Sequence, residues 1–94
     1  MKFEFEWNGA KAEANLQAHG VSFDLAKTVF YDPFAVERLD DREDYGEDRF
    51  VIVGMAEGAV ALFVAYSERE GRMRIISARR ATQNEQDDYF QQNS

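Results

Sequence analysis

The chain has 94 residues, no cysteine and one histidine, and its formal net charge is −7. This length predicts one domain over residues 1–94. This composition excludes a disulfide, a cysteine nucleophile and a metal site built from thiolates or several histidines. No apolar run reaches the roughly 18 residues of a membrane span, and the first residues lack a signal peptide. We therefore expect a cytoplasmic, bacterial-type protein that binds no membrane and no cofactor.

The N-terminal third predicts a short strand and two helices. Residues 3–7 alternate aromatic and acidic side chains, which is the period of a half-buried strand. A helix over residues 9–18 follows, with Asn8 suited to cap its first turn. A second helix covers residues 22–32 and stops before Pro33, because the residue that precedes a proline disfavours helical geometry.

The rest of the chain predicts a sheet and a terminal helix. Strands are expected at residues 34–39, 50–53, 59–66 and 72–78. A helix over residues 83–91 begins at Thr82, with Glu85 as its capping-box partner, and Tyr89 and Phe90 are expected to face inward. The order β-α-α-β-β-β-β-α predicts an α+β domain with an antiparallel sheet, two N-terminal helices and a C-terminal helix.

Basic residues cluster in one segment, residues 69–82, which reads REGRMRIISARRAT. It holds five of the 11 Lys and Arg residues and one glutamate, so it carries +4 and the remainder carries −7 − 4 = −11. A positive segment on an acidic background favours a site for an anion. The alternative is a solvated strand whose arginines protect a sheet edge. The arginines are Arg69, Arg72, Arg74, Arg79 and Arg80.

The spacing of these arginines predicts which ones share a face of the sheet. A regular strand places Arg72, Arg74 and Arg80 on one face and Arg79 on the other. A bulge or an early helix start near Ser77 would instead bring Arg79 and Arg80 together. Two adjacent guanidinium groups can hold a phosphate and stabilise the charge that develops on it, without a metal.

Three residues near the N-terminus are further candidates. An exposed Trp7 can stack on a nucleic-acid base while Lys11 contacts a phosphate, or Trp7 lies in the core beside a surface lysine. His19 has an unperturbed pKa near neutrality and is a candidate general acid or base. Alternatively, it is a helix C-terminal residue that favours the helix dipole.

An acidic loop over residues 40–48 invites comparison with calcium sites. Its spacing is not that of an EF-hand loop, and no glycine lies at the required offset. A solvated turn, or a patch for a basic partner, is therefore preferred over a cation site.

Taken together, these residues resemble the BrnT family of type II toxins. The resemblance runs from residue 5 to about residue 89 and rests on FEWNGAKAEANLQAHGVSFDLAKTVFYDP, GEDRFVIVG and YSEREGRMRIISARRAT. It implies a RelE-like fold and a ribonuclease that arrests growth by cutting RNA. It also implies a BrnA-like antitoxin with a ribbon-helix-helix DNA-binding region. The complex would repress its own operon, and operator DNA would be bound only through the antitoxin.

The resemblance also implies roles for individual residues. The positions that match the family's motifs are Trp7, Lys11, His19, Glu68, Arg69, Arg79 and Arg80. By similarity to metal-free ribonucleases of this fold, the RNA 2′-hydroxyl would attack the adjacent phosphorus. Arg69, Arg79 and Arg80 would stabilise the developing charge, and Glu68 or His19 would move protons. Trp7, Lys11, Arg72 and Arg74 would bind the RNA.

The C-terminal segment departs from the family. It reads ATQNEQDDYFQQNS, with no basic residue where the family's terminal helix is rich in arginine. The alternative function is therefore a catalytically weak or inactive subunit that binds its antitoxin and tunes DNA repression. The same acidity would suit a basic antitoxin.

Overall fold

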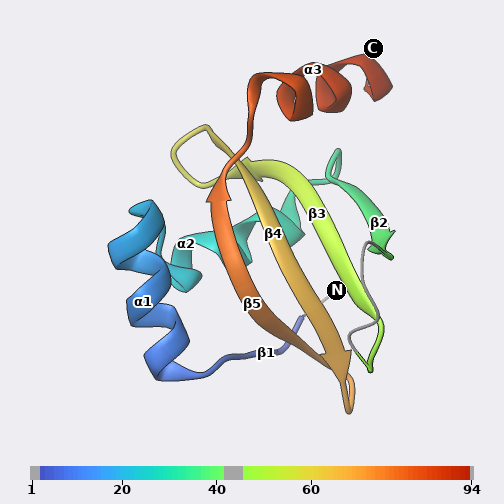
Figure 1. The fold of residues 1–94 in the computed structure, drawn as a ribbon. Coiled ribbons are helices and arrows are strands. Elements are labelled where there is room, and N and C mark those ends of the chain that lie inside the picture. Colours follow the sequence, from blue (N-terminus) through green and yellow to red (C-terminus); the bar gives the residue numbers. More distant parts are fainter. Residues whose placement is uncertain (1–2, 42–45, 94) are drawn as a thin grey trace.

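The computed structural model describes residues 3–41 and 46–93 (Figure 1). Its elements are β1 (Phe5–Glu6), α1 (Gly9–His19), α2 (Phe23–Ala26), the 3₁₀ helix η1 (Lys27–Tyr31), β2 (Val36–Asp40), β3 (Arg49–Ala56), β4 (Val60–Arg69), β5 (Arg72–Arg80) and α3 (Gln83–Gln92). The α+β class and the order of elements are confirmed. The second predicted helix is two short pieces, because four α-helical residues continue directly into the tighter 3₁₀ turn of η1.

The sheet has five strands in the order β1-β5-β4-β3-β2. Strands β2 to β5 form the predicted antiparallel meander. The prediction of an all-antiparallel sheet is wrong for β1, which pairs with β5 in parallel through Phe5↔Met73 and Glu6↔Arg74. Alternating side chains identify a strand, but β5, the partner of β1, comes much later in the chain and is chosen by packing.

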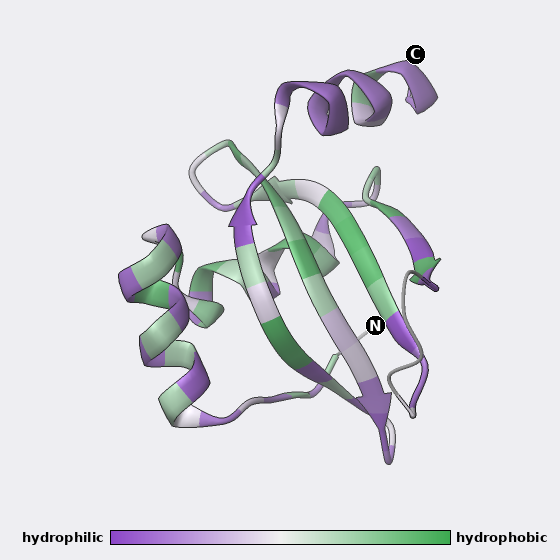
Figure 2. Cartoon of the chain, in the orientation of Figure 1, coloured by the Kyte–Doolittle hydropathy of each residue, from purple (hydrophilic) through white to green (hydrophobic). Residues whose placement is uncertain are grey.

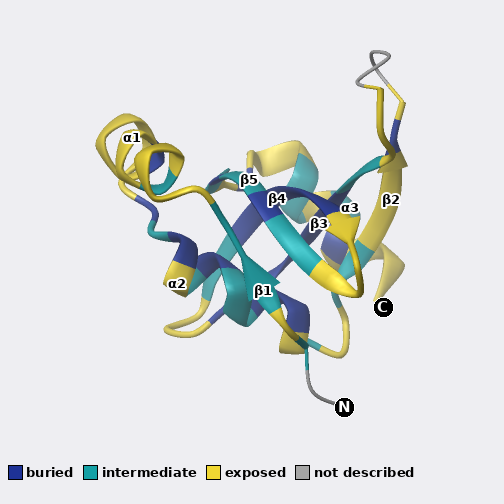
Figure 3. Cartoon of the chain, turned by 90° about the horizontal axis from the view of Figure 1, so that it is seen from below, coloured by how far each residue is buried: buried dark blue, intermediate teal, exposed yellow. Residues whose placement is uncertain are grey.

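Each face of the sheet carries its own apolar cluster. One face packs against α1, α2 and η1; in Figure 1, α1 lies to the side of β5 and α2 lies behind the strands. Its apolar cluster includes Phe23, Val29, Leu62, Val64 and Ile75. The other face is covered in part by α3. That second cluster consists of Val51, Val53, Phe63, Ala65, Ala81 and Tyr89. Figure 3 shows the buried positions along the strands and the exposed outer side of α1.

Local capping signals agree with the structure. The Asn8 side chain accepts from the N–H of Lys11 at 3.0 Å, and Gly20 ends α1 in the left-handed conformation at φ 68°. At α3, Thr82 and Glu85 form the predicted capping box. Tyr89 is buried as expected, but Phe90 is 56% exposed, so the prediction that Phe90 faces inward is wrong. Successive positions of a helix point in different directions, so the two residues cannot both face the sheet.

Asn15 fixes the position of α1 against β5. Its amide nitrogen donates to the carbonyls of Val21 and Ala78 at 2.9 and 2.8 Å, and its oxygen accepts from the N–H of Ala78 at 3.1 Å. The buried side chain thus replaces a neighbouring strand at this part of β5. As a result, His19, one turn further along α1, lies toward the C-terminal end of β5.

Candidate functional site

A β-bulge in β5 decides which arginines share a face. Ala65 pairs with Ser77 and Tyr66 pairs with Ile75, so one extra residue of β5 lies between these pairs. The expected bulge is present, but it does not bring the two neighbouring arginines together. Beyond the bulge, Arg79 lies opposite Phe63 and Arg80 lies opposite Leu62. The two guanidinium groups therefore leave opposite faces of the sheet, and a shared phosphate between them is not the arrangement observed.

The face that carries Arg79 also collects arginines from four strands. Residues paired across neighbouring strands share a face, and every second residue along a regular strand returns to it. By this register the arginine face comprises Arg38, Arg49, Arg69, Arg72, Arg74 and Arg79. One row crosses all five strands and consists of Asp40, Arg49, Ser67, Arg74 and Glu6.

The arginine face has a covered half and an open half. The α3 helix packs over the apolar cluster near the C-terminal end of β5. At the opposite end, the hairpin between β4 and β5 turns tightly through Glu70 and Gly71, both at positive φ. The charged end of this hairpin is hydrophilic in Figure 2. We call the part of the face from Ser67 to this hairpin, away from α3, the open half.

Arg79 connects β5 to α3. It donates two hydrogen bonds to the Glu85 carboxylate, at 2.8 and 2.9 Å, and its guanidinium lies 4.1 Å from the centre of the Phe63 ring. The hydrogen bonds from Arg79 are the main cause that lowers the pKa of Glu85. Glu85 also accepts from the N–H of Thr82 as part of the capping box. Arg79 and the start of α3 therefore form one hydrogen-bonded unit.

The arginines of the open half have looser partners. Arg74 donates one hydrogen bond from Nη1 to Glu6 at 2.9 Å, and Arg72 lies 3.9 Å from the Glu4 carboxylate. The Arg69 guanidinium forms no ion pair with any residue in 3–41 or 46–93. Exposed ion pairs contribute little to stability, so a phosphate can compete for these guanidinium groups.

Asp32 holds the other end of α3. Its carboxylate accepts hydrogen bonds from the hydroxyl of Tyr89 at 2.6 Å, the N–H of Met55 at 2.8 Å and the N–H of Phe34 at 2.9 Å. Burial alone would raise the pKa of Asp32, but these three donors outweigh it and the pKa is lowered. Burial, together with the Asp32 carboxylate, raises the pKa of Tyr89 to about 12. The aspartate of the Asp32-Pro33 pair thus ties η1, β3 and α3 together.

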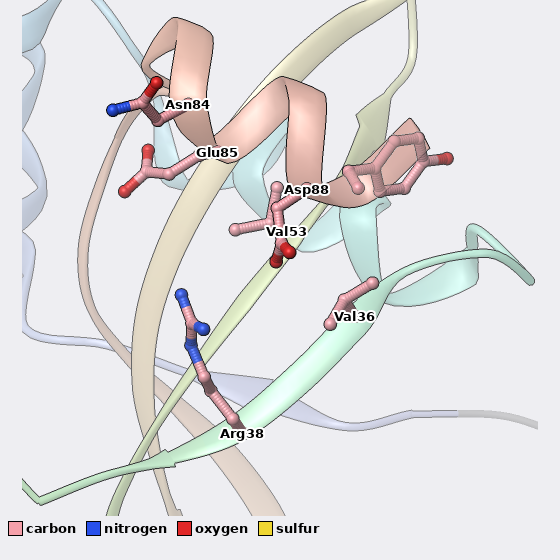
Figure 4. A pocket seen from close by; sticks show the side chains of 7 residues that line it. Val36, Arg38, Val53, Asn84, Glu85 and Asp88 are labelled. Atoms are coloured by element: carbon pink, nitrogen blue, oxygen red, sulfur yellow. The ribbon is translucent and has the colours of Figure 1, made fainter. Parts of the chain in front are cut away.

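Two clefts lie between α3 and the β2 edge of the arginine face. One, with a volume of about 210 Å³, is shown in Figure 4, where Arg38 reaches from β2 toward Glu85 and Asp88 of α3. The second, of about 380 Å³, shares Arg38 and Glu85 and extends to Arg79. Because acidic and basic groups line both clefts together, neither carries the net positive charge that a phosphate site needs.

The structure divides the residues predicted from sequence between the two ends of the sheet. Glu68, Arg69, Arg72 and Arg74 lie at the open end, whereas Arg79, Arg80 and His19 lie at the end near α3. Phe63, opposite Arg79, and Arg69 are six residues apart along β4, which corresponds to about 20 Å. This distance is too large for both ends to contact a single phosphate.

The remaining candidates lie on or beside α1. Trp7 is half-buried, packs edge-to-face on Phe23 with ring centres 5.9 Å apart, and lines a recess of about 150 Å³ with Leu16. This packing matches the core alternative for Trp7 and leaves one edge of the ring accessible. Lys11 is exposed in the first turn of α1, and His19 is its exposed last residue.

Sequence reasoning did not identify several residues of the site. Arg38, Arg49 and Ser67 join the arginine face only through strand register, and Glu6 and Glu85 were not recognised as arginine partners. Glu68 was identified, but its pairing with Met73 places its side chain on the opposite face of the sheet, the face that also carries Glu37. The pKa of Glu37 is raised by burial and by the Glu68 carboxylate. The signal that could have placed Arg38 and Arg49 on this face was the alternation of side chains along residues 36–40 and 49–53, which separates the two faces of paired strands.

Metal and membrane predictions can be checked for part of the chain. Residues 42–45 of the acidic loop lie outside the described residues, and the rest of the structure holds no group of three or more His, Asp or Glu side chains that could bind a metal ion. No helix among residues 3–41 and 46–93 is long and apolar enough to span a membrane.

A mixed five-stranded sheet with an arginine-rich face and helices on both sides defines a small α+β domain. The family model described as "Ribonuclease toxin, BrnT, of type II toxin-antitoxin system" matches residues 7–85, and the chain belongs to this family. It is similar to the Brucella abortus ribonuclease toxin BrnT, known from a 1.1 Å crystal structure, with 19% sequence identity and a TM-score of 0.64. The match covers 87% of this chain and 100% of that chain, which shows a shared fold. A comparison with curated proteins gave no match.

Proposed function

We propose that this chain is an endoribonuclease that cuts RNA without a metal ion and thereby arrests growth. The observation that carries the proposal is the open half of the arginine face, in a chain that belongs to a family of ribonuclease toxins. Guanidinium groups supply there the positive charge that a metal ion supplies in other nucleases.

The proposed reaction is an internal transfer at one phosphodiester. The RNA 2′-oxygen attacks the adjacent phosphorus, and its proton passes to a general base. The bond from phosphorus to the 5′-oxygen breaks, and that oxygen takes up a proton from an acid or from water. A 2′,3′-cyclic phosphate and a 5′-hydroxyl result. Arg69, exposed at the end of β4, is proposed to stabilise the charge on phosphorus. Glu68 pairs with Met73 and so leaves the opposite face of the sheet from Arg69, and its role as the base remains a prediction.

The other predicted residues bind or position RNA in this proposal. Arg72 and Arg74 contact phosphates beside the reacting one, and Trp7 and Lys11 contact RNA that leaves the sheet along α1. The catalytic roles predicted for Arg79, Arg80 and His19 remain predictions. Their distance from Arg69 favours contacts several nucleotides away for Arg80 and His19, and a positioning role for Arg79 through α3.

Expression in bacteria tests the proposal directly. We expect the chain alone to arrest growth and the neighbouring antitoxin gene to restore it. Arg69→Ala is expected to lower RNA cleavage by about 10²- to 10³-fold, the usual cost of removing one charge-stabilising donor. Lys27→Ala is the matched control, because it removes a positive charge paired only with Asp24 at the surface. Equal activity of the Arg69 and Lys27 variants would exclude Arg69 from the reaction.

A specific observation supports the alternative function. Glu4, Glu6 and Glu85 are already ion-paired with three of the arginines, and α3 has no basic residue. An antitoxin-binding subunit with little catalysis would still need this face. Under this alternative, expression alone leaves growth unchanged, while the complex still binds the operator more tightly than the antitoxin does.

The proposed partner is a BrnA-like ribbon-helix-helix antitoxin, which supplies all contacts to operator DNA. The net charge of −7 supports this division of labour, since non-specific DNA affinity comes from neutralised phosphates. We propose that the antitoxin covers the arginine face and Trp7 and so blocks RNA. The complex, and not the free toxin, would then repress the operon.

A further inference from the structure

Ser67 is the least explained polar residue of the open half. It is 1% exposed, and its hydroxyl has no hydrogen-bond partner within the part of the chain that the structure describes. A buried hydroxyl without a partner destabilises a fold by its full desolvation penalty, and such groups are rare in proteins. An alanine would fill the same space without that penalty.

The neighbours of Ser67 show what its hydroxyl faces. Across the sheet it lies opposite Arg49 on β3 and Arg74 on β5, and along β4 the next residues on the same face are Ala65 and Arg69. Three of its four nearest neighbours on this face are therefore arginines. The α3 helix packs over the other half of the face.

We propose that Ser67 forms the floor of a phosphate-binding site whose walls are Arg49, Arg69 and Arg74. When a phosphate binds, the guanidinium N–H groups that are left for a ligand and the Ser67 hydroxyl donate to its oxygens. Planar guanidinium groups match phosphate geometry, and a hydroxyl at short range adds a directed hydrogen bond. The identification of the ligand as an RNA phosphate rests on the proposed function.

Glu6 acts as a positioning residue in this site. It accepts one hydrogen bond from Nη1 of Arg74, and both side chains are less than one-third exposed. An arginine has five N–H donors, so this contact fixes the guanidinium while it leaves donors for a ligand. Because Glu6 and Arg74 are partners in the parallel pairing of β1 and β5, the short strand β1 serves to deliver this carboxylate.

The experiment compares Ser67→Ala with Ser77→Ala, the same substitution one row away on the same face, opposite Ala65. Binding is measured by fluorescence anisotropy with a 2′-O-methyl RNA oligonucleotide, which cannot be cleaved, and the melting temperature is measured in parallel. We expect Ser67→Ala to bind about tenfold more weakly and to melt about 4 to 8 °C higher. Ser77→Ala should leave the dissociation constant unchanged.

A second variant keeps the test independent of the serine. Arg74→Met retains an apolar stem and should weaken binding and reduce the salt slope of the logarithm of affinity by about one. If Ser67→Ala binds as tightly as the parent, or if the parent does not bind the oligonucleotide, the site is refuted. Binding that depends on Ser67 in a chain that cleaves no RNA would support the site and refute the proposed nuclease function. RNA cleavage by a chain whose RNA binding does not depend on Ser67 would support the nuclease function and refute the site.

Discussion

The hydrogen bond from Tyr89 to Asp32 makes a sharp prediction about what holds α3 to the sheet. Tyr89→Phe removes only the hydroxyl, whose oxygen lies 2.6 Å from the Asp32 carboxylate. Tyr89 is 5% exposed, so water cannot easily take the place of the lost donor. A hydrogen bond to a charged acceptor contributes about 1.5–3 kcal/mol to the free energy of unfolding. For a domain of this size, we expect the melting temperature to fall by about 6–24 °C.

The pH dependence of this loss follows from the two pKa shifts. The pKa of Asp32 is lowered in the folded state, so its contribution is present above its ordinary value of 3.8 and is lost as the pH falls through the folded pKa. The pKa of Tyr89 is raised to about 12, so its contribution is present below its ordinary value of 10.0 and is lost as the pH rises toward 12. The difference between parent and variant should be largest between these limits.

Chemical denaturation at several pH values measures this difference. Tyr31→Phe is the matched control, because Tyr31 is 53% exposed and its hydroxyl makes no hydrogen bond within the described residues. We expect Tyr31→Phe to change stability by less than about 0.5 kcal/mol. If the two variants are equally stable at pH 7, or if the effect of Tyr89→Phe does not shrink in acid, the Asp32 anchor does not hold α3.

Three further predictions concern the site and its partner. Arg79→Met and Glu85→Gln should each lower stability by about 1–3 kcal/mol and expose α3 to limited proteolysis, whereas Arg72→Met should not; equal protease resistance in all three would contradict the Arg79–Glu85 connection. RNA cleavage should persist in EDTA, and activity restored only by Mg²⁺ or Mn²⁺ would overturn the metal-free mechanism. In gel-shift assays the antitoxin and the complex should bind operator DNA, and a shift by the toxin alone would show that the antitoxin is not the sole DNA-binding component.

The sequence predicted best where the signal is local. Asn8, Thr82 and Glu85 cap their helices as expected, because a cap depends on residues three positions apart. The fold class followed from the alternation of apolar residues along the strands. The parallel partner of β1 did not, because it is chosen by packing across almost the whole chain.

The site was only partly predictable for a related reason. The arginine-rich segment was visible in the sequence, but the bulge in β5 reversed the expected face of Arg79, and no residue near Ser77 signals a bulge unambiguously. Arg38 and Arg49 arrive from other strands by register alone. Contacts between residues far apart in the sequence require the sheet to be assembled first.

The ion pairs between glutamates and arginines differ in strength along the arginine face. Arg79 has a carboxylate that is only 17% exposed, two short hydrogen bonds and an aromatic ring beneath it, so a phosphate would have to break a well-made contact. Arg72 and Glu4 are 53% and 71% exposed and 3.9 Å apart, so an incoming phosphate loses little by replacing that carboxylate. In the proposed function, RNA binding at the open end would exchange one anion for another, and the glutamates would hold the guanidinium groups in place until RNA arrives. This difference in strength is the physical reason why the proposed function places the phosphate contacts at the Arg69 end of the face and assigns Arg79 to the attachment of α3.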